Sequence, residues 1–251
     1  MAGEVEVAQV LLYARDLKVQ YDATRAREQD LRLAYGRLQA AHRQSLRYAD
    51  DLKGTHDRLQ RAFFQSLLGL ANALEAKDPY TRGHSERVAR LAEQLALRIG
   101  CSRSEARIIA QAGLLHDLGK IGMPEAVLRK AGPLTEEEWR LMREHPVVGA
   151  QIVAPLEFFS EGARIVRHHH ERSNGSGYPA GLSGEAIPLG ARIVAVADVY
   201  DALTSDRPYR GSLGRAAALD HIEEAAGHLL DPEIVSAFLR LVSDGCPDPR
   251  L

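Results

Sequence analysis

The sequence predicts an all-α protein in which a long helix precedes a helical bundle. Residues 1–63 contain no proline and only three glycines among many charged residues, a composition typical of one long helix. After residue 63, amphipathic segments alternate with short breaks that contain glycine or proline. Since no pair of segments has the pattern of a β-hairpin, we expect a helical dimerisation segment over 1–62 and one helical domain over 63–251.

A heptad pattern runs through residues 1–62. One heptad position is rich in leucine and carries Val10, Leu17, Thr24, Leu31, Leu38, Ser45, Leu52 and Leu59. The other is more polar and carries Ala14, Tyr21, Glu28, Tyr35, His42, Ala49, His56 and Phe63. Because an isolated helix with so narrow an apolar stripe has no core of its own, the pattern favours a homodimeric coiled coil. The alternative is a single amphipathic helix that folds back on the rest of the chain.

Hydrophobic periodicity and helix-start signals predict further helices in the remainder of the chain. In order, they cover residues 64–77, 84–99, 104–117, 124–129, 135–144, 146–154, 160–170, 190–205, 213–227 and 231–243. Ser102 and Thr135 are of the residue types preferred at helix N-caps, and Pro232 suits the first turn of the last helix.

Two of these segments need separate comment. The sequence ARIVAVADVY, residues 191–200, is rich in β-branched residues, but it has no partner strand and its apolar run continues into DALTS. We therefore expect a buried helix there. Residues 173–190 form the longest irregular segment, and they follow a cluster of histidines. Loops of this length in compact domains are usually functional or disordered.

Composition excludes several classes of protein. With 32 Lys+Arg against 34 Asp+Glu, the formal net charge is -2, so there is no global positive field to hold a nucleic-acid polymer. The two cysteines, Cys101 and Cys246, are far apart in sequence and predict neither a disulfide scaffold nor a zinc ribbon. No signal-peptide pattern and no membrane-spanning apolar run is evident. We expect a cytoplasmic chain with no membrane insertion.

Histidines and two aspartates fall at the ends of predicted helices or within them: His84, His116, Asp117, His145, His168, His169, His170 and Asp198. Imidazole and carboxylate together suit divalent iron, manganese or zinc, and a carboxylate can bridge two ions. One buried histidine alone is more often a hydrogen-bonded structural group. Several such residues at the apolar ends of different helices are costly unless they converge. Since neighbours on a helix are rotated by about 100°, the three consecutive histidines cannot all face one point.

Five motifs, in order, carry a resemblance to a known family. They are EAKDPYTRGHSERV, LLHDLGKIGMP, REHPVVGA with its lone His145, HHERSNGSGYP, and ARIVAVADVYDALTSDRPYR. Together they closely resemble the HD-GYP family, the metal-dependent cyclic di-GMP phosphodiesterases of the HD superfamily. The resemblance covers residues 63–232 and implies an HD-type helical bundle as the catalytic domain.

Carried over residue by residue, the resemblance implies a set of metal ligands. These are His84, His116, Asp117, His145, His169, His170 and Asp198. Asp117 is expected to bridge two divalent ions, iron or alternatively manganese. Some relatives have a glutamate one turn before the first histidine that recruits a third metal, whereas this chain has Tyr80 there. The resemblance therefore predicts two metals.

The resemblance also implies substrate contacts. Lys120 resembles the family's phosphate-contacting lysine, so that Asp117 and Lys120 are the expected catalytic residues. Arg207 and Arg210 resemble its ligands to substrate phosphate, and the ring of Tyr178 is suited to stack on guanine. One departure is the pair Ser173-Asn174, where the family usually has Trp-Asp; it bears on the loop and leaves the metal ligands unchanged.

The implied reaction is hydrolysis of cyclic di-GMP to pGpG, with GMP as the product of a second cleavage. Attack by a metal-activated hydroxide at a two-metal centre is the implied mechanism. The resemblance also implies contact of the GYP loop with GGDEF-type cyclases. Two alternatives stay open: a non-catalytic cyclic-dinucleotide receptor that signals through the coiled coil, and an HD phosphohydrolase for another cyclic dinucleotide such as cyclic GMP-AMP.

Overall fold

The computed structural model describes residues 2–77, 83–130, 132–205 and 211–244. Within them the chain forms α-helices and short 3-10 helices, and its only extended pairing is an isolated bridge between Ala226 and Leu230. The all-α prediction is confirmed. The chain divides between Ala62 and Phe63 into two units, which are described separately below.

The α-helices are α1 Ala2–Lys77, α2 His84–Arg98, α3 Arg103–Leu115, α4 Glu125–Leu128, α5 Glu136–Met142, α6 His145–Val153, α7 Ser160–His168, α8 Leu189–Thr204, α9 Arg215–Ala225 and α10 Pro232–Ser243. The 3-10 helices are η1 Leu118–Gly122, η2 Glu157–Phe159 and η3 Gly184–Ala186. Ends agree with the predicted ranges to within a few residues. The separate helix expected over residues 64–77 is wrong: these residues are the last part of α1, because no proline or C-capping glycine stands near residue 63 to end that helix.

In the first unit, the leucines of the heptad seam are exposed along α1. The exposed fractions of Leu17, Leu31 and Leu38 are 56%, 71% and 66%. Such side chains give a single helix no core, so the coiled-coil partner stays a prediction. Among the described residues, no helix combines the length and the apolar character needed to cross a membrane.

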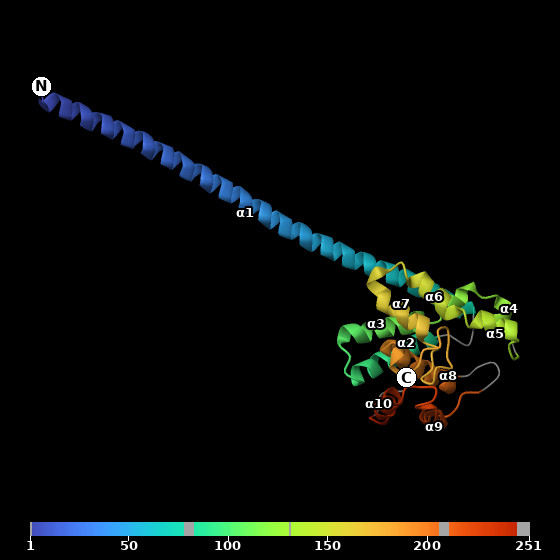
Figure 1. The fold of residues 1–251 in the computed structure, drawn as a ribbon. Helices are drawn as coiled ribbons and strands as arrows, with labels where there is room; N and C mark the ends of the chain where they lie inside the picture. The colour runs from blue at the N-terminus through green and yellow to red at the C-terminus, as the bar shows by residue number, and fades with distance from the viewer. Residues whose placement is uncertain (1, 78–82, 131, 206–210, 245–251) are drawn as a thin grey trace. The chain divides into compact units, whose positions relative to one another are not determined.

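The second unit is built around α2, α3 and α8. These three helices pack against one another, with α6 and α7 on one side and α9 and α10 on the other (Figure 1). The largest buried side chains between them include Leu91, Leu95, Leu115, Ile193 and Phe238. Helix α8 is buried along most of its length, which explains why its sequence is β-branched and apolar on nearly every face.

Local signals set the helix ends as expected. Ser102 and Thr135 each form a capping box, in which the hydroxyl accepts from the backbone N–H three residues later and that residue's glutamate accepts from the cap N–H. The carboxylate of Asp231 accepts from the backbone N–H groups of Glu233 and Ile234 at the start of α10. These caps fix where α3, α5 and α10 begin.

A close backbone approach joins η1 to α6. A Cβ placed on Gly119 would lie 1.9 Å from the carbonyl oxygen of His145 and 2.5 Å from the backbone nitrogen of Gly149. Only glycine fits at position 119 without moving one of the two segments. Because Asp117 precedes η1 and His145 begins α6, this approach sets the spacing between two residues of the predicted centre.

We predict that Gly119→Ala destabilises the second unit, because its Cβ would force backbone atoms of η1 and α6 apart. The free energy of unfolding should fall by at least about 1–3 kcal/mol, as measured by urea denaturation. Gly122→Ala is the matched control in the same 3-10 helix, since the nearest atom to its Cβ is a valine methyl at 3.9 Å. Equal stability of the two variants would contradict the packing argument.

Candidate metal centre

The predicted ligands come from five places in the second unit and meet in one buried cluster. His84 begins α2, His116 and Asp117 follow α3, His145 begins α6, His169 and His170 follow α7, and Asp198 lies within α8. Six of the seven therefore sit at or just beyond a helix end. Short side chains placed there can reach a common point because the helix ends converge.

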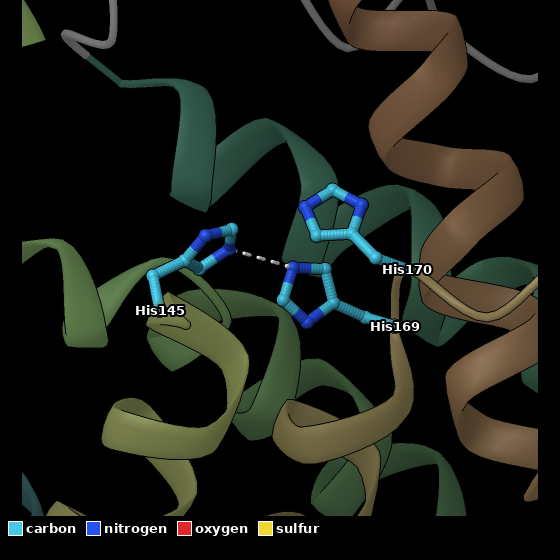
Figure 2. Close-up of side chains that lie close together, drawn as sticks. All are labelled: His145, His169 and His170. Atoms are coloured by element: carbon cyan, nitrogen blue, oxygen red, sulfur yellow. Dashed lines mark hydrogen bonds between the residues drawn. The ribbon is translucent and has the colours of Figure 1, made fainter. Parts of the chain in front are cut away.

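Three overlapping groups of ligand atoms have the spacing of a metal site, each with its atoms within 4.8 Å of one another. They are His145 with His169 and His170, His84 with His116 and Asp198, and His116 with Asp117 and His169. Figure 2 shows the first group, with the ring of His145 directed at His169 and the ring of His170 beside it. The Nε2 atoms of His145 and His169 are 3.3 Å apart.

Asp117 lies between the first two groups. Its Oδ1 is 3.3 Å from Nε2 of His145, and its Oδ2 is 3.6 Å from Nε2 of His116. The two oxygens of one carboxylate thus face histidines of different groups. The same Oδ2 accepts from the ammonium of Lys120 at 2.5 Å, so the lysine lies at the edge of the cluster.

Backbone carbonyls orient three of the rings. The Nδ1 atoms of His116, His145 and His169 each lie 2.7 Å from the carbonyl oxygen three residues earlier, of Gly113, Met142 and Val166 respectively. A carbonyl only accepts, so each Nδ1 carries the proton and each Nε2 presents its lone pair to the cluster. This is the tautomer that a metal ligand bound through Nε2 requires.

His84 is oriented differently. Its Nε2 is 3.3 Å from Asp198 Oδ1 and from His116 Nε2, while its Nδ1 is 2.6 Å from Oδ2 of Asp201. Asp201 is buried, and its two oxygens also accept from the guanidinium of Arg87 at 2.6 and 3.0 Å. The Nδ1 atom of His84 therefore contacts a carboxylate, whereas the Nδ1 atoms of His116, His145 and His169 contact backbone carbonyls.

Burial and neighbouring charges shift the protonation of the cluster. Burial lowers the pKa of His145 to about 4 and that of His170 to about 3. Burial alone would raise the pKa of Asp117, but Lys120 and the neighbouring histidines hold it well below its usual range. His145 and His170 are thus neutral and Asp117 is ionised at neutral pH, and these are the forms that bind metals.

His84 is the exception among these rings. Burial opposes its protonation, yet the carboxylates of Asp198 and Asp201 raise its pKa to about 9. Two negative charges beside one ring favour the cation. A divalent ion would compete with a proton for the Nε2 of this residue.

His168 is the one of the three consecutive histidines that points elsewhere; helical geometry predicted only that they do not all face one point. Its Nδ1 lies 3.4 Å from the buried carboxylate of Glu171, and it belongs to none of the three groups. Glu171 in turn accepts from the backbone N–H groups of Ala180 and Leu182, at 2.7 and 3.0 Å. This carboxylate holds the loop that contains Tyr178.

Tyr178 packs beside the cluster. Its ring centroid is 4.9 Å from that of His170, and the two rings are inclined by 33°. Burial raises its pKa, so the phenol keeps its proton. Asn174 Nδ2 contacts Nδ1 of His228 at 3.1 Å, which ties the unusual Ser173-Asn174 pair to the turn after α9. The other predicted positions, Arg207, Arg210 and Tyr80, lie outside the described residues.

Sequence reasoning missed Asp201 and Glu171 as partners of the cluster and its loop. A signal for Asp201 was present: it lies three residues after Asp198 in a nearly continuous apolar helix, and residues three apart share one helix face. A second ionisable group on that buried face needs a partner. Nothing in the local pattern pointed to Arg87 as that partner.

The fold and the cluster together define a class: an all-helical domain that gathers imidazoles and carboxylates from separate helices. The donor set fits divalent transition metals, because the buried rings of His145 and His170 are neutral, ligand atoms of several histidines converge, and the carboxylate of Asp117 lies between them. A family model described as HD domain matches residues 69–234, about two thirds of the chain. The chain belongs to the HD domain family, as its HD-GYP motifs predict.

Curated relatives share the same region. The chain is 48% identical over 178 residues to the cyclic di-GMP phosphodiesterase response regulator RpfG of Xanthomonas campestris, covering 70% of this chain and 47% of that one. It is 38% identical over 189 residues to the 3'3'-cGAMP-specific phosphodiesterase 3 of Vibrio cholerae, covering 75% and 41%. The chain therefore spans less than half the length of these relatives.

A solved structure gives the same fold. A cyclic GMP-AMP specific phosphodiesterase of Vibrio cholerae aligns over 72% of this chain and 49% of its own, with a TM-score of 0.57 and 22% identity. At that identity the likeness concerns the fold alone.

We predict that acid destabilises the chelator-treated protein through His145 and His170. Their folded-state pKa values, about 4 and about 3, lie below the ordinary 6.5, so below pH 6.5 the unfolded chain binds protons that the folded chain excludes. The free energy of unfolding should therefore fall from pH 6.5 toward pH 4, with His145 contributing on the order of 3 kcal/mol.

Urea titrations at a series of pH values measure this slope. His145→Asn should flatten it, whereas the matched control His221→Asn, at an exposed position in α9, should leave it unchanged. An unaltered slope in His145→Asn would contradict the assignment of a buried neutral ring. His84 acts in the opposite sense: its stabilisation is present below pH 6.5 and is lost as the pH rises toward 9.

Proposed function

We propose that this chain is a metal-dependent phosphodiesterase that hydrolyses cyclic di-GMP to pGpG, with or without a second cleavage to GMP, at a two-metal centre. The observation that carries the proposal is the position of Asp117, whose two oxygens face histidines of two different ligand groups. A carboxylate so placed suits a bridge between two ions. The relative named as a cyclic di-GMP phosphodiesterase, at 48% identity, supports the choice of substrate.

Each of the two proposed ions has its own group of ligands. His145, His169 and His170 would hold one, His84, His116 and Asp198 the other, and Asp117 would bridge them. Iron, or alternatively manganese, is our proposal for the metal, since mixed imidazole and carboxylate donors suit both. When bound, such ions supply a hydroxide nucleophile from water at neutral pH and offset charge on the scissile phosphate.

The remaining residues orient the substrate. Lys120 pairs with Asp117 at the edge of the cluster, where its positive charge can contact a phosphate oxygen and stabilise the charge of the transition state. Tyr178, held beside His170 by its loop, offers a ring face for a guanine base. Arg207 and Arg210 are proposed as further phosphate ligands on the sequence motif alone.

A second candidate substrate is 3'3'-cGAMP, because a relative at 38% identity is named as specific for it. The two dinucleotides differ in one base, so the same metal and phosphate contacts would serve both.

The test is to incubate anaerobically purified protein, loaded with Fe(II) or Mn(II), with each dinucleotide separately and to separate the products by chromatography. Formation of pGpG and GMP from cyclic di-GMP supports the first choice. Turnover of 3'3'-cGAMP alone favours the second, and tight binding without turnover of either favours a receptor.

We predict that substitutions at Asp117 and at Lys120 have different effects on metal content and on the catalytic rate. Asp117→Ala should lose both metals and the activity together, because it removes the proposed bridge. Lys120→Ala should keep the metal content and lower kcat by about 10²- to 10³-fold, as expected for one lost electrostatic contact to the transition state. Metal analysis of the purified variants and product formation measure the two effects.

The matched control for Asp117→Ala is Asp220→Ala, at an exposed position in α9. It should retain both metal and activity. Full activity in Asp117→Ala would rule out the two-metal arrangement.

We propose further that α1 forms a homodimer through its heptad seam. The seam leucines are exposed along a helix that has no core within the first unit, and a second copy of the same segment would cover them.

We also propose, from the family resemblance alone, that the loop over residues 173–182 contacts a GGDEF-type cyclase. The two distant cysteines support a reducing, cytoplasmic location.

We predict that the double substitution Leu31→Glu and Leu38→Glu converts the dimer to a monomer, because it places charges at the same seam position in two successive heptads. Light scattering coupled to size-exclusion chromatography measures the mass. Leu33→Glu is the matched control, since Leu33 is similarly exposed, at 57%, but lies off the seam. A wild-type chain that is already monomeric would refute the dimer.

A further inference from the structure

The two nitrogens of His84 have unlike environments. The Nε2 atom faces Asp198 and His116 within the cluster, whereas Nδ1 lies 2.6 Å from Asp201 Oδ2. At His116, His145 and His169, the corresponding Nδ1 partner is a neutral backbone carbonyl. His84 is thus the ring in this set whose outer nitrogen is held by a charged side chain.

The Asp201 carboxylate is itself fixed. It is 2% exposed, and the guanidinium of Arg87 donates to it through Nε at 2.6 Å and through Nη2 at 3.0 Å. The hydroxyl of Ser205, one turn later, lies 3.3 Å from Oδ2. A planar guanidinium on a carboxylate holds that carboxylate in one orientation, which in turn holds the plane of the His84 ring.

Helix geometry explains why α8 can act on both sides of this ring. Asp198 and Asp201 are three residues apart and so project from the same face of α8. Asp198 contacts Nε2 and Asp201 contacts Nδ1. Two residues of α8 therefore lie on either side of the ring of His84, which is the first residue of α2. A shift of α8 relative to α2 would alter both contacts together.

We propose that Asp201 is a positioning residue for the centre: it holds the Nδ1 proton of His84, and so keeps the lone pair of Nε2 directed at the metal-binding cluster. The inference rests on the proposed metal-dependent function. A hydrogen bond to a carboxylate fixes the tautomer of a ligating histidine and strengthens it as a donor, and loss of such a partner weakens metal affinity. Arg87 acts through Asp201 by fixing its orientation.

A purely structural ion pair is the alternative, and the same domain contains one for comparison. Arg192 donates to Asp231 through Nη1 at 2.7 Å, and Asp231 is also largely buried and caps α10. Its recorded partners are this arginine and backbone N–H groups. Asp231→Ala therefore breaks a similar ion pair that does not include the His84 ring.

The experiment measures Mn(II) binding to the chelator-treated full chain by equilibrium dialysis, alongside thermal unfolding of the metal-free protein. Asp201→Ala should weaken binding at the affected site by roughly 10- to 100-fold. Asp201→Asn should weaken it less, because its amide oxygen still accepts from Nδ1. Asp231→Ala should lower the melting temperature but leave the Mn(II) affinity within about twofold, since it removes a cap and an ion pair only.

Any of three results would overturn the inference, two of them obtained with the alanine variants. One is wild-type Mn(II) affinity in Asp201→Ala; the other is an equal loss of affinity in Asp231→Ala, which would point to general destabilisation. If the alanine variant does not fold, the isosteric Asp201→Asn variant is compared with the wild-type chain instead. Wild-type Mn(II) affinity in Asp201→Asn would then indicate that Asp201 has a structural role only. Failure of the wild-type chain itself to bind either Mn(II) or, under anaerobic conditions, Fe(II) would refute the proposed function, and this outcome is seen before any variant is compared.

Discussion

The structure depends on one constraint: imidazoles and carboxylates are placed inside an apolar helical core, where an unpaired polar group costs free energy. His116, His145 and His169 are each 1–2% exposed. Among the described residues, every buried side-chain nitrogen or oxygen has a hydrogen-bond partner. The cluster is therefore supported on its outer side by the protein, while its inner side presents lone pairs and negative charge to a common point.

Helix ends provide much of that support. The last carbonyls of an α-helix have no partner within the helix, and a histidine that follows the helix can donate to one of them. His116 does this at the end of α3 and His169 at the end of α7, each to the carbonyl three residues earlier. The same contact satisfies the helix end and fixes the tautomer of the ring. Packing of α3 against α7 then brings the two rings together, with centroids 5.1 Å apart.

Helix α8 and the loop before it provide the rest. Two carboxylates on one face of α8 lie on either side of His84, and Glu171 holds the Tyr178 loop through backbone N–H groups. Of these three carboxylates, those of Asp201 and Glu171 are buried, at 2% and 4% exposed. The stability of the bundle and the arrangement of the cluster thus depend on the same contacts, so that a substitution at one is expected to affect the other. Gly119, where η1 meets α6, belongs to this set because it sets the approach of two segments that carry cluster residues.

Much of this protein was determined by local sequence. The capping residues Ser102, Thr135 and Asp231 start their helices, and apolar periodicity gives the bundle. The motifs around His116 and His169 indicate the family, because they are contiguous in sequence. Other features were decided only by tertiary structure. The pairing of His84 with Asp201 joins residues on α2 and α8. The two oxygens of Asp117 face different histidines because η1 packs against α6 and α3 packs against α7. Periodicity tells which face of a helix is buried, but the partner on that face depends on helices distant in sequence, and their approach is set by side-chain packing.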